Sequence, residues 1–195
     1  MTTTTHLLYL HGFRSSPSSA KARKMADIVQ ARHPAVTWWC PQLDASPQRA
    51  ISALSVGLSS WPRERMAIMG SSLGGFYAAW LAQQLGCPAV LLNPAVHPAR
   101  DLAGYIGEHP AWHDPSQKIF FEAAYVQELA DLEAQTPPRK PKTLAVIAKG
   151  DEVLDWREMW ARHKAGRVRL LEGSDHALSD FDLYLPEILE FLHLA

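Results

Sequence analysis

The sequence predicts an α/β protein with about six mainly parallel strands and helices on both faces of the sheet. Short apolar runs alternate with longer segments of helical periodicity, which is the pattern of β–α–β units. The apolar runs are nearly continuous, as expected for strands that are buried on both faces. A chain of 195 residues without an internal repeat or a long linker is expected to form one domain, residues 1–195.

Strands are expected where several residues in a row are mostly apolar. These runs are residues 7–10, 36–40, 66–69, 89–92, 143–148 and 168–171. Helices are expected in the longer amphipathic segments, which are residues 18–32, 46–60, 72–85, 120–134, 156–164 and 181–193. The first helix opens on serines, and the third stops at Gly86 and Pro88, which are residue types common at helix ends.

Residues 94–142 form a proline-rich connection that is too long for a simple crossover. Once a crossover helix is subtracted, the remaining residues suffice for one short helix and loops fixed by proline. We therefore expect a rim beside the functional site and no full lid. Residues 110–112 and the pair Phe120–Phe121 are expected to pack on the body or to form one wall of a groove.

Composition argues against several functional classes. A net charge of −1 gives no basic surface for nucleic acid. Residues 1–6 contain no basic region, and the apolar run at 7–10 is too short for a signal peptide or a membrane span. We therefore expect a cytoplasmic protein.

Cysteine and histidine usage gives no sign of a metal site. Cys40 and Cys87 are expected to be free thiols, because no pattern pairs them as a disulfide or as metal ligands. His109 and His113 are four residues apart, but Pro110 between them argues against the helix that would align them. No metal and no cofactor are expected.

The segment Gly70-Ser71-Ser72-Leu73-Gly74 predicts a nucleophile elbow, because Gly-x-Ser-x-Gly here joins an expected strand to an expected helix. Ser72 is expected to have a strained backbone conformation. Gly70 and Gly74 are expected where strand and helix pass too closely for side chains. Ser71 is the rival nucleophile, but it lacks glycines two positions to either side.

A serine hydroxyl is a poor nucleophile without a base, and the ends of the later strands supply one. His176 lies in a turn-rich loop after the last expected strand, and Asp151 directly follows the strand before it. We therefore expect Ser72 to be the nucleophile, His176 the base, and Asp151 the carboxylate that orients the base. Asp155 is expected to cap the next helix and is the alternative acid. Glu152 is expected to point the other way if this segment is extended.

The loop after the first strand, His11-Gly12-Phe13-Arg14, belongs to the same edge of the sheet. Its glycine lets the backbone turn, and we expect the N–H groups of Phe13 and Leu73 to form an oxyanion hole. His11 is expected to shape this loop, and His11 and Arg14 are both candidate substrate contacts. A further hypothesis is that Arg14 and Lys21 attract an anionic leaving group, such as a phosphorylated thiol carrier.

These motifs resemble the α/β-hydrolase superfamily and, more narrowly, the small YqiA-like esterases. The segments that carry the resemblance are residues 11–13, 70–75, 92–96, 150–155 and 173–176. The resemblance covers nearly the whole chain and implies an abbreviated α/β-hydrolase fold without the usual first two strands. It also implies Ser72, Asp151 and His176 in the roles given above. Ser174 stands where such proteins often have a second glycine, a departure that is not expected to disturb the base.

The expected activity is hydrolysis of carboxylic esters or acyl thioesters through an acyl-enzyme on Ser72, with a small acyl compound as substrate. A peptidase or amidase with the same residues is the alternative among enzymes. A non-catalytic binding protein on this fold is the alternative outside them. The identity of the acyl group, the leaving group and the oligomeric state do not follow from the sequence.

Overall fold

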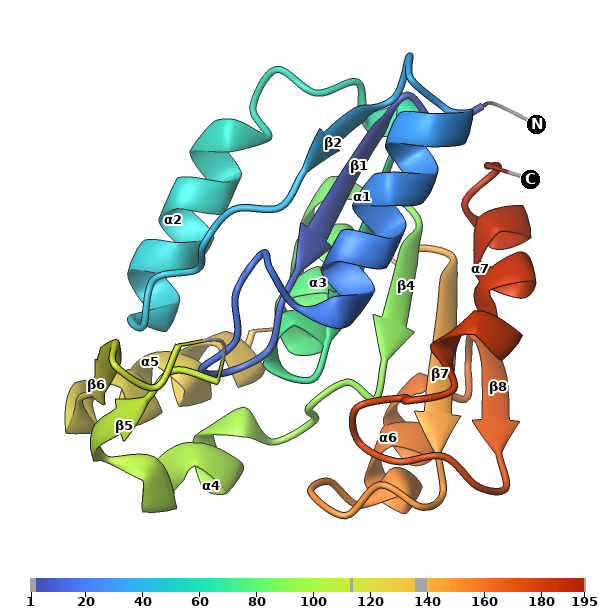
Figure 1. The fold of residues 1–195 in the computed structure, drawn as a ribbon. Helices are drawn as coiled ribbons and strands as arrows, with labels where there is room; N and C mark the ends of the chain where they lie inside the picture. Colours follow the sequence, from blue (N-terminus) through green and yellow to red (C-terminus); the bar gives the residue numbers. More distant parts are fainter. Residues whose placement is uncertain (1–2, 113, 136–139, 195) are drawn as a thin grey trace.

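The computed structural model describes residues 3–112, 114–135 and 140–194. A parallel sheet of six strands, in the order β2-β1-β3-β4-β7-β8, lies at its centre (Figure 1). The strands are β1 (His6–Leu10), β2 (Thr37–Trp39), β3 (Met66–Ser71), β4 (Ala89–Leu92), β7 (Thr143–Ala148) and β8 (Arg167–Leu171). All six match the expected runs to within a few residues, and the predicted fold class is confirmed.

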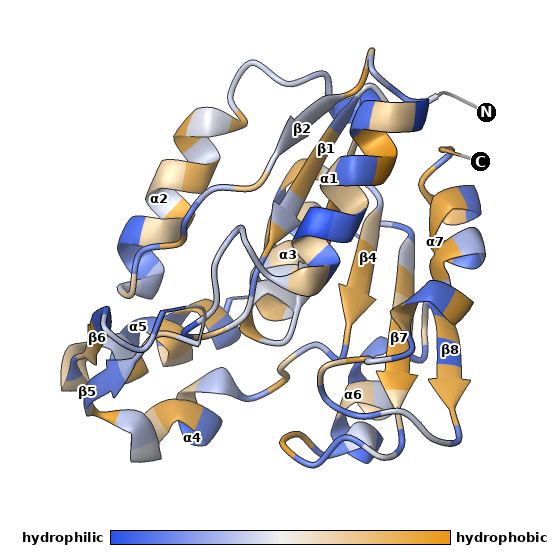
Figure 2. Ribbon diagram, in the orientation of Figure 1, coloured by the Kyte–Doolittle hydropathy of each residue, from blue (hydrophilic) through white to orange (hydrophobic). Residues whose placement is uncertain are grey.

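Helices cover both faces of this sheet, as predicted. On one face lie α2 (Pro47–Gly57), α3 (Leu73–Leu85), α5 (Ala123–Glu133) and α6 (Trp156–His163). On the other face lie α1 (Ala20–Arg32) and α7 (Leu185–Phe191). Side chains alternate between the two faces along β1, since Leu8 and Leu10 join the first core and Leu7 and Tyr9 the second. Figure 2 shows largely apolar strands β4 and β7, whereas α1 carries polar turns on its outer side.

The last predicted helix is interrupted in the structure. Residues 181–193 form a short 3-10 turn, η3 (Phe181–Leu183), followed by α7, whose first turn contains Pro186. Proline has no backbone N–H to give to a preceding turn, so the helix starts at this position instead of running through it. A similar turn, η1 (Arg63–Arg65), precedes β3.

The connection 94–142 contains a β-hairpin that the sequence analysis did not predict. Strands β5 (Gly107–Pro110) and β6 (Lys118–Phe121) pair in antiparallel fashion. The start of the expected helix 120–134 is therefore strand, which agrees with the β preference of Ile119, Phe120 and Phe121. Before the hairpin come α4 (Pro98–Leu102) and the 3-10 turn η2 (Ala103–Tyr105).

The described part of this connection lies beside Ser72 without enclosing it, and Ser72 is only half-buried. Phe121 packs into the core with 1% exposure, while Phe120 and Trp112 lie on the surface of the rim. Cys40 and Cys87 are both free, and they lie on opposite faces of the sheet. Among the described residues, no helix has the length and apolar composition needed to cross a membrane.

Candidate active site

The turn between β3 and α3 has the geometry of a nucleophile elbow. Ser72 has φ 56° and ψ −122°, a conformation that L-residues rarely adopt. A Cβ atom added to Gly70 would lie 2.1 Å from Gly74 O, and one added to Gly74 would lie 2.2 Å from Leu10 O. Both glycines are therefore required by backbone contacts, as predicted, and Ser72 is held at the edge of the sheet between them.

The structure brings together the three side chains that the sequence placed on separate strands. The distance between His176 Nε2 and Ser72 Oγ is 3.1 Å, and that between His176 Nδ1 and Asp151 Oδ2 is 2.8 Å. A carboxylate can only accept, so the proton lies on Nδ1 and leaves Nε2 free to accept from the serine hydroxyl. The strand register explains why these side chains lie close together. Leu10 pairs with Gly70 and Ala148 pairs with Leu171, so these strands end at the same edge of the sheet.

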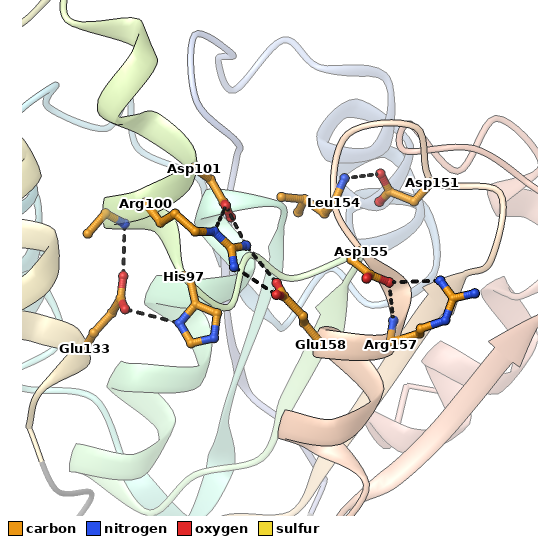
Figure 3. Close-up of polar contacts among 10 residues, drawn as sticks. His97, Arg100, Asp101, Glu133, Asp151, Leu154, Asp155, Arg157 and Glu158 are labelled. Atoms are coloured by element: carbon orange, nitrogen blue, oxygen red, sulfur yellow. Dashed lines mark hydrogen bonds and ion pairs between the residues drawn. The ribbon is translucent and has the colours of Figure 1, made fainter.

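The Asp151 carboxylate is fully buried, and hydrogen bonds compensate for its burial. Its Oδ1 accepts from the backbone N–H groups of Val153 and Leu154, both at 2.8 Å, and the second of these bonds is drawn in Figure 3. Asp155 instead caps α6 by accepting from the N–H of Arg157 at 2.9 Å, as predicted. The structure thus places Asp151, and not Asp155, against the histidine.

The orientation expected for Glu152 required an extended segment, and this segment is not extended. Glu152 Oε2 accepts from the backbone N–H of His176 at 3.0 Å, and its side chain lines the cleft beside Ser72. The assumed extended backbone does not exist after Asp151, because the two bonds to its carboxylate fold residues 151–154 into a tight turn. Glu152 is therefore turned toward the loop that carries His176.

Asn93 is not among the predicted site residues, but its side chain connects three segments of the site. It is fully buried at the end of β4 with φ 39°. Its Nδ2 donates to the carbonyl oxygens of Asp175 and His176, at 3.0 and 3.2 Å. Its Oδ1 accepts from the N–H of Ala148 at 2.8 Å. One side chain thus links the ends of three strands.

Ser174 has a backbone conformation that favours glycine. Its φ is 68°, in the left-handed region that glycine adopts without strain. Here the serine hydroxyl is bonded to Asp180, which holds the conformation in place. The substitution leaves the His176 contacts intact, as expected.

Two backbone N–H groups are available beside Ser72. Among the hydrogen bonds of the described loops and helix caps, none is donated by the N–H of Phe13 or of Leu73. A Cβ on Gly12 would lie 3.3 Å from Ser72 Cβ, so the first loop passes directly against the serine. Leu73 begins α3, and the N-terminus of a helix favours negative charge. This arrangement agrees with the expected oxyanion hole.

Ser72 and His176 open into a cleft of about 510 Å³. Its rim side is lined by apolar groups of α4, η2 and Trp112, and its other side by residues 152–154 and Ala177. Charged groups in the lining are Arg14, Asp101 and Glu152. The Arg14 guanidinium donates to Pro110 O at 2.8 Å and lies 4.2 Å from the Trp112 ring centre, so it already has partners.

Ion pairs fasten the rim of the cleft to the body (Figure 3). Arg100 on α4 donates two hydrogen bonds to Glu158 on α6, at 2.8 and 2.7 Å. Glu133 on α5 accepts from the N–H of Ala99 in the first turn of α4, at 2.9 Å. These contacts hold α4 between two helices of the body and fix that wall of the cleft.

The structure does not bring Lys21 into the site. Its ammonium group donates to the carbonyl of Ala177, and it lines neither cavity near Ser72. His11 is buried, with Nε2 accepting from the N–H of Leu43 at 3.1 Å, so it shapes the first loop as predicted. It also lines a second cavity beyond Leu73. His109 lies in β5, while His113 falls outside the described residues.

Comparison with known proteins identifies the family of the chain. Residues 6–193 match the model of a family described as "Uncharacterised protein family (UPF0227)". UPF0227 proteins of Yersinia pseudotuberculosis and Yersinia pestis are 21% identical over 191 residues, which is 97% of this chain and 99% of theirs.

Solved structures of hydrolases superpose on nearly the whole chain. One such structure comes from work on LipS and LipT, two metagenome-derived lipolytic enzymes. It gives a TM-score of 0.71 at 18% sequence identity, covering 100% of this chain and 96% of that one. Est1E of Butyrivibrio proteoclasticus with bound ferulic acid gives a TM-score of 0.73 at 14% sequence identity, covering 97% of this chain and 88% of that one. Mouse alpha/beta hydrolase domain-containing protein 10 gives a TM-score of 0.71 at 12% sequence identity, covering 98% of this chain and 92% of that one. The chain has an α/β-hydrolase fold, as its motifs predicted.

Proposed function

Because the chain belongs to the UPF0227 family and has an α/β-hydrolase fold, we propose that it is a serine hydrolase of carboxylic esters or acyl thioesters. The observation that carries the proposal is the hydrogen-bonded series Ser72–His176–Asp151 at the edge of the sheet. A histidine with its proton fixed on Nδ1 can take the serine proton on Nε2, which turns a weak nucleophile into a strong one.

In the proposed reaction Ser72 Oγ attacks the acyl carbon while His176 takes its proton. The negative charge that develops on the carbonyl oxygen is stabilised by the N–H groups of Phe13 and Leu73. A donor of this kind contributes about 3 kcal/mol to lowering the barrier. His176 then gives its proton to the leaving group, and water hydrolyses the acyl-enzyme in a second round of the same chemistry.

The lining of the cleft favours an uncharged leaving group. Asp101 and Glu152 carry negative charge there, and the guanidinium of Arg14 is already engaged by Pro110 O and Trp112. Arg14 keeps its positive charge, but the lining also contains Glu152 and Asp101, the latter paired with Arg100, so it offers an anionic carrier no excess of positive charge. We therefore expect neutral esters and thioesters to be hydrolysed at least as efficiently as thioesters of a phosphorylated carrier. A clear preference for the phosphorylated carrier, lost in Arg14→Ala, would contradict this expectation.

A fluorophosphonate probe tests the nucleophile, because it labels an activated serine covalently. Label is expected on the wild type and on Ser71→Ala, and not on Ser72→Ala. Turnover of a short-chain ester should fall by several orders of magnitude in Ser72→Ala and in His176→Ala, and the double variant should be little worse than either. Ser71→Ala is the matched control, since the two serines are adjacent and Ser71 is buried at the end of β3.

The same experiments separate the alternatives. An unlabelled wild type that hydrolyses no acyl compound would favour a non-catalytic binding protein. Faster turnover of peptides or amides than of esters with the same acyl group would favour a peptidase or amidase. Substantial activity in Ser72→Ala would overturn the assignment of the nucleophile.

A further inference from the structure

No hydrogen bond joins the Tyr77 hydroxyl to another described residue, and, unlike the Tyr9 hydroxyl, this group is not closed off from solvent. Tyr77 lies on α3, one turn after the elbow, and only 2% of its surface is exposed. Its side chain lines a cavity of about 390 Å³. A ligand that fills this cavity without accepting a hydrogen bond from the hydroxyl would leave it unpaired, at a cost of about 1–3 kcal/mol. The Tyr77 hydroxyl can therefore discriminate between ligands that do and do not carry an acceptor.

The Tyr77 hydroxyl is suited to donate. Burial first, and then the negative charges of Glu128 and Asp44, raise the pKa of Tyr77 far above its usual value. The group therefore stays protonated at any pH at which the protein functions. Glu128 and Asp44 accept hydrogen bonds from Ser46 and Arg49, and neither is bonded to the Tyr77 hydroxyl in the described structure.

The Tyr77 cavity adjoins the proposed reaction centre. It shares three lining residues, Phe13, Arg14 and Leu73, with the cleft that contains Ser72. Two of these carry the N–H groups assigned to the oxyanion. Polar groups of Ser15, Gln42 and Gln117 lie around the same cavity, so its lining is mixed rather than apolar. Its volume lies within the range of small-molecule sites.

The strand order decides which part of a substrate would reach Tyr77. The cavity is lined by the loops after β1 and β2, and β2 is one edge of the sheet. His176 follows β8, the other edge, and Ser72 follows β3 between them (Figure 1). The leaving group must lie beside His176 to receive its proton. The acyl group therefore extends the opposite way, toward the β2 side and Tyr77.

We propose that this cavity is an acyl subsite and that Tyr77 recognises an oxygen-bearing group, such as a hydroxyl, on the acyl chain of the substrate. This inference rests on the proposed hydrolase function and adds the chemical class of the acyl group. A hydroxyl on the chain accepts the hydrogen bond of Tyr77 in place of solvent. Unsubstituted chains of the same size leave the tyrosine unpaired.

The test is a series of p-nitrophenyl esters with ω-hydroxyacyl chains of increasing length. Each is compared with the unsubstituted ester that has the same number of heavy atoms, so the leaving group and the size are constant. At one chain length the hydroxyl should raise kcat/KM about five- to tenfold, the effect of one hydrogen bond. In Tyr77→Phe this ratio should fall to about one. The wild-type ratio needs no variant, so it remains informative if Tyr77→Phe folds poorly.

Tyr9→Phe is the matched control. Tyr9 is also a fully buried tyrosine whose hydroxyl lacks a partner among the described residues, but it lies in the core on the other face of the sheet. Its substitution should leave the ratio between hydroxylated and unsubstituted esters at the wild-type value. A drop in both variants would indicate a general loss of packing and would overturn the assignment of Tyr77.

Failure of the subsite and failure of the hydrolase proposal give different results. If esters are hydrolysed but no chain length gains from the hydroxyl, the acyl subsite is wrong and the hydrolase function stands. If no ester is hydrolysed and Ser72 is not labelled, the hydrolase proposal is wrong, and the subsite falls with it. A structure of Ser72 bonded to an ω-hydroxyalkyl phosphonate should place the chain hydroxyl against Tyr77. A chain that lies along α4 instead would also overturn the subsite.

Discussion

The side-chain amide of Asn93 donates a hydrogen bond to the backbone carbonyl of His176, with 3.2 Å between Nδ2 and the oxygen. The two residues are 83 positions apart in the chain, and Asn93 makes the same kind of bond to Asp175. Because its Oδ1 also accepts from Ala148, the amide ties the loop of the base to the strand that leads to Asp151. Asn93 is therefore a positioning residue for the proposed base.

Asn93→Asp is expected to lower kcat about 10- to 100-fold with little change in KM. An aspartate keeps the size of the side chain and tolerates its left-handed backbone, but it cannot donate to the two carbonyl oxygens. A small displacement of a catalytic group is enough to produce a loss of this size. Steady-state kinetics with a short-chain ester measure the effect.

Gln127→Glu is the control for Asn93→Asp, because it makes the same amide-to-acid change on the exposed face of α5. It should leave kcat unchanged. Thermal unfolding of both variants separates a shift in position from a loss of folded protein. An unchanged kcat in folded Asn93→Asp would show that the loop holds the base without this amide.

Asp151→Asn should reduce turnover severely, while Asp155→Asn should have a mild effect. The first change removes the acceptor that fixes the proton on His176 Nδ1. The second weakens the N-cap of α6, which costs about 1 kcal/mol of stability. Measuring kcat/KM of both variants with the same ester shows which substitution has the larger effect. The reverse ranking would move the acid to Asp155.

Arg100→Ala should raise KM several-fold with a small effect on kcat. Its bonds to Glu158 hold α4, whose residues Pro98 and Leu102 line the cleft, while Ser72 and His176 lie elsewhere. Exposed ion pairs contribute only about 0–1 kcal/mol, so stability should change little. Lys24→Ala, which breaks the exposed pair with Asp182 between α1 and η3, is the control and should leave KM unchanged. Equal KM values in Arg100→Ala and the wild type would mean that α4 keeps its place without the pair.

His163 should make folding less stable as the pH falls. Burial, and to a smaller extent Arg162, lower the pKa of His163 to about 4, whereas the unfolded value is about 6.5. The unfolded state therefore takes up the proton first. Stability is lost as the pH falls from about 6.5 to about 4, by up to about 3 kcal/mol.

Urea unfolding of the wild type and of His163→Gln across this pH range measures the contribution of His163. The difference between their unfolding free energies should shrink toward low pH, because the variant has no proton to take up. Parallel curves would show that another group is responsible for the dependence on pH.

Local patterns were sufficient to place most of the candidate site. Apolar runs fixed the strands, since strands buried on both faces admit few polar residues. Parallel strands then bring the residues that follow them to one edge, which is why Ser72, Asp151 and His176 could be named from chain order. The Gly-x-Ser-x-Gly turn could also be predicted from local sequence, because its glycines are required by backbone contacts between consecutive elements.

Contacts between distant segments decided the rest. The hairpin at 107–121 pairs residues whose β preference competes with a helical pattern, and only its packing on the body settles the outcome. Glu152 turns toward His176 because the carboxylate of Asp151 folds the loop between them. The sequence around Asn93 and Tyr77 did not indicate a role in the site. An amide or a phenol in an apolar segment has the same sequence context whether it packs in the core or faces a site. Their roles depend on what folding brings next to them, which the sequence order does not record.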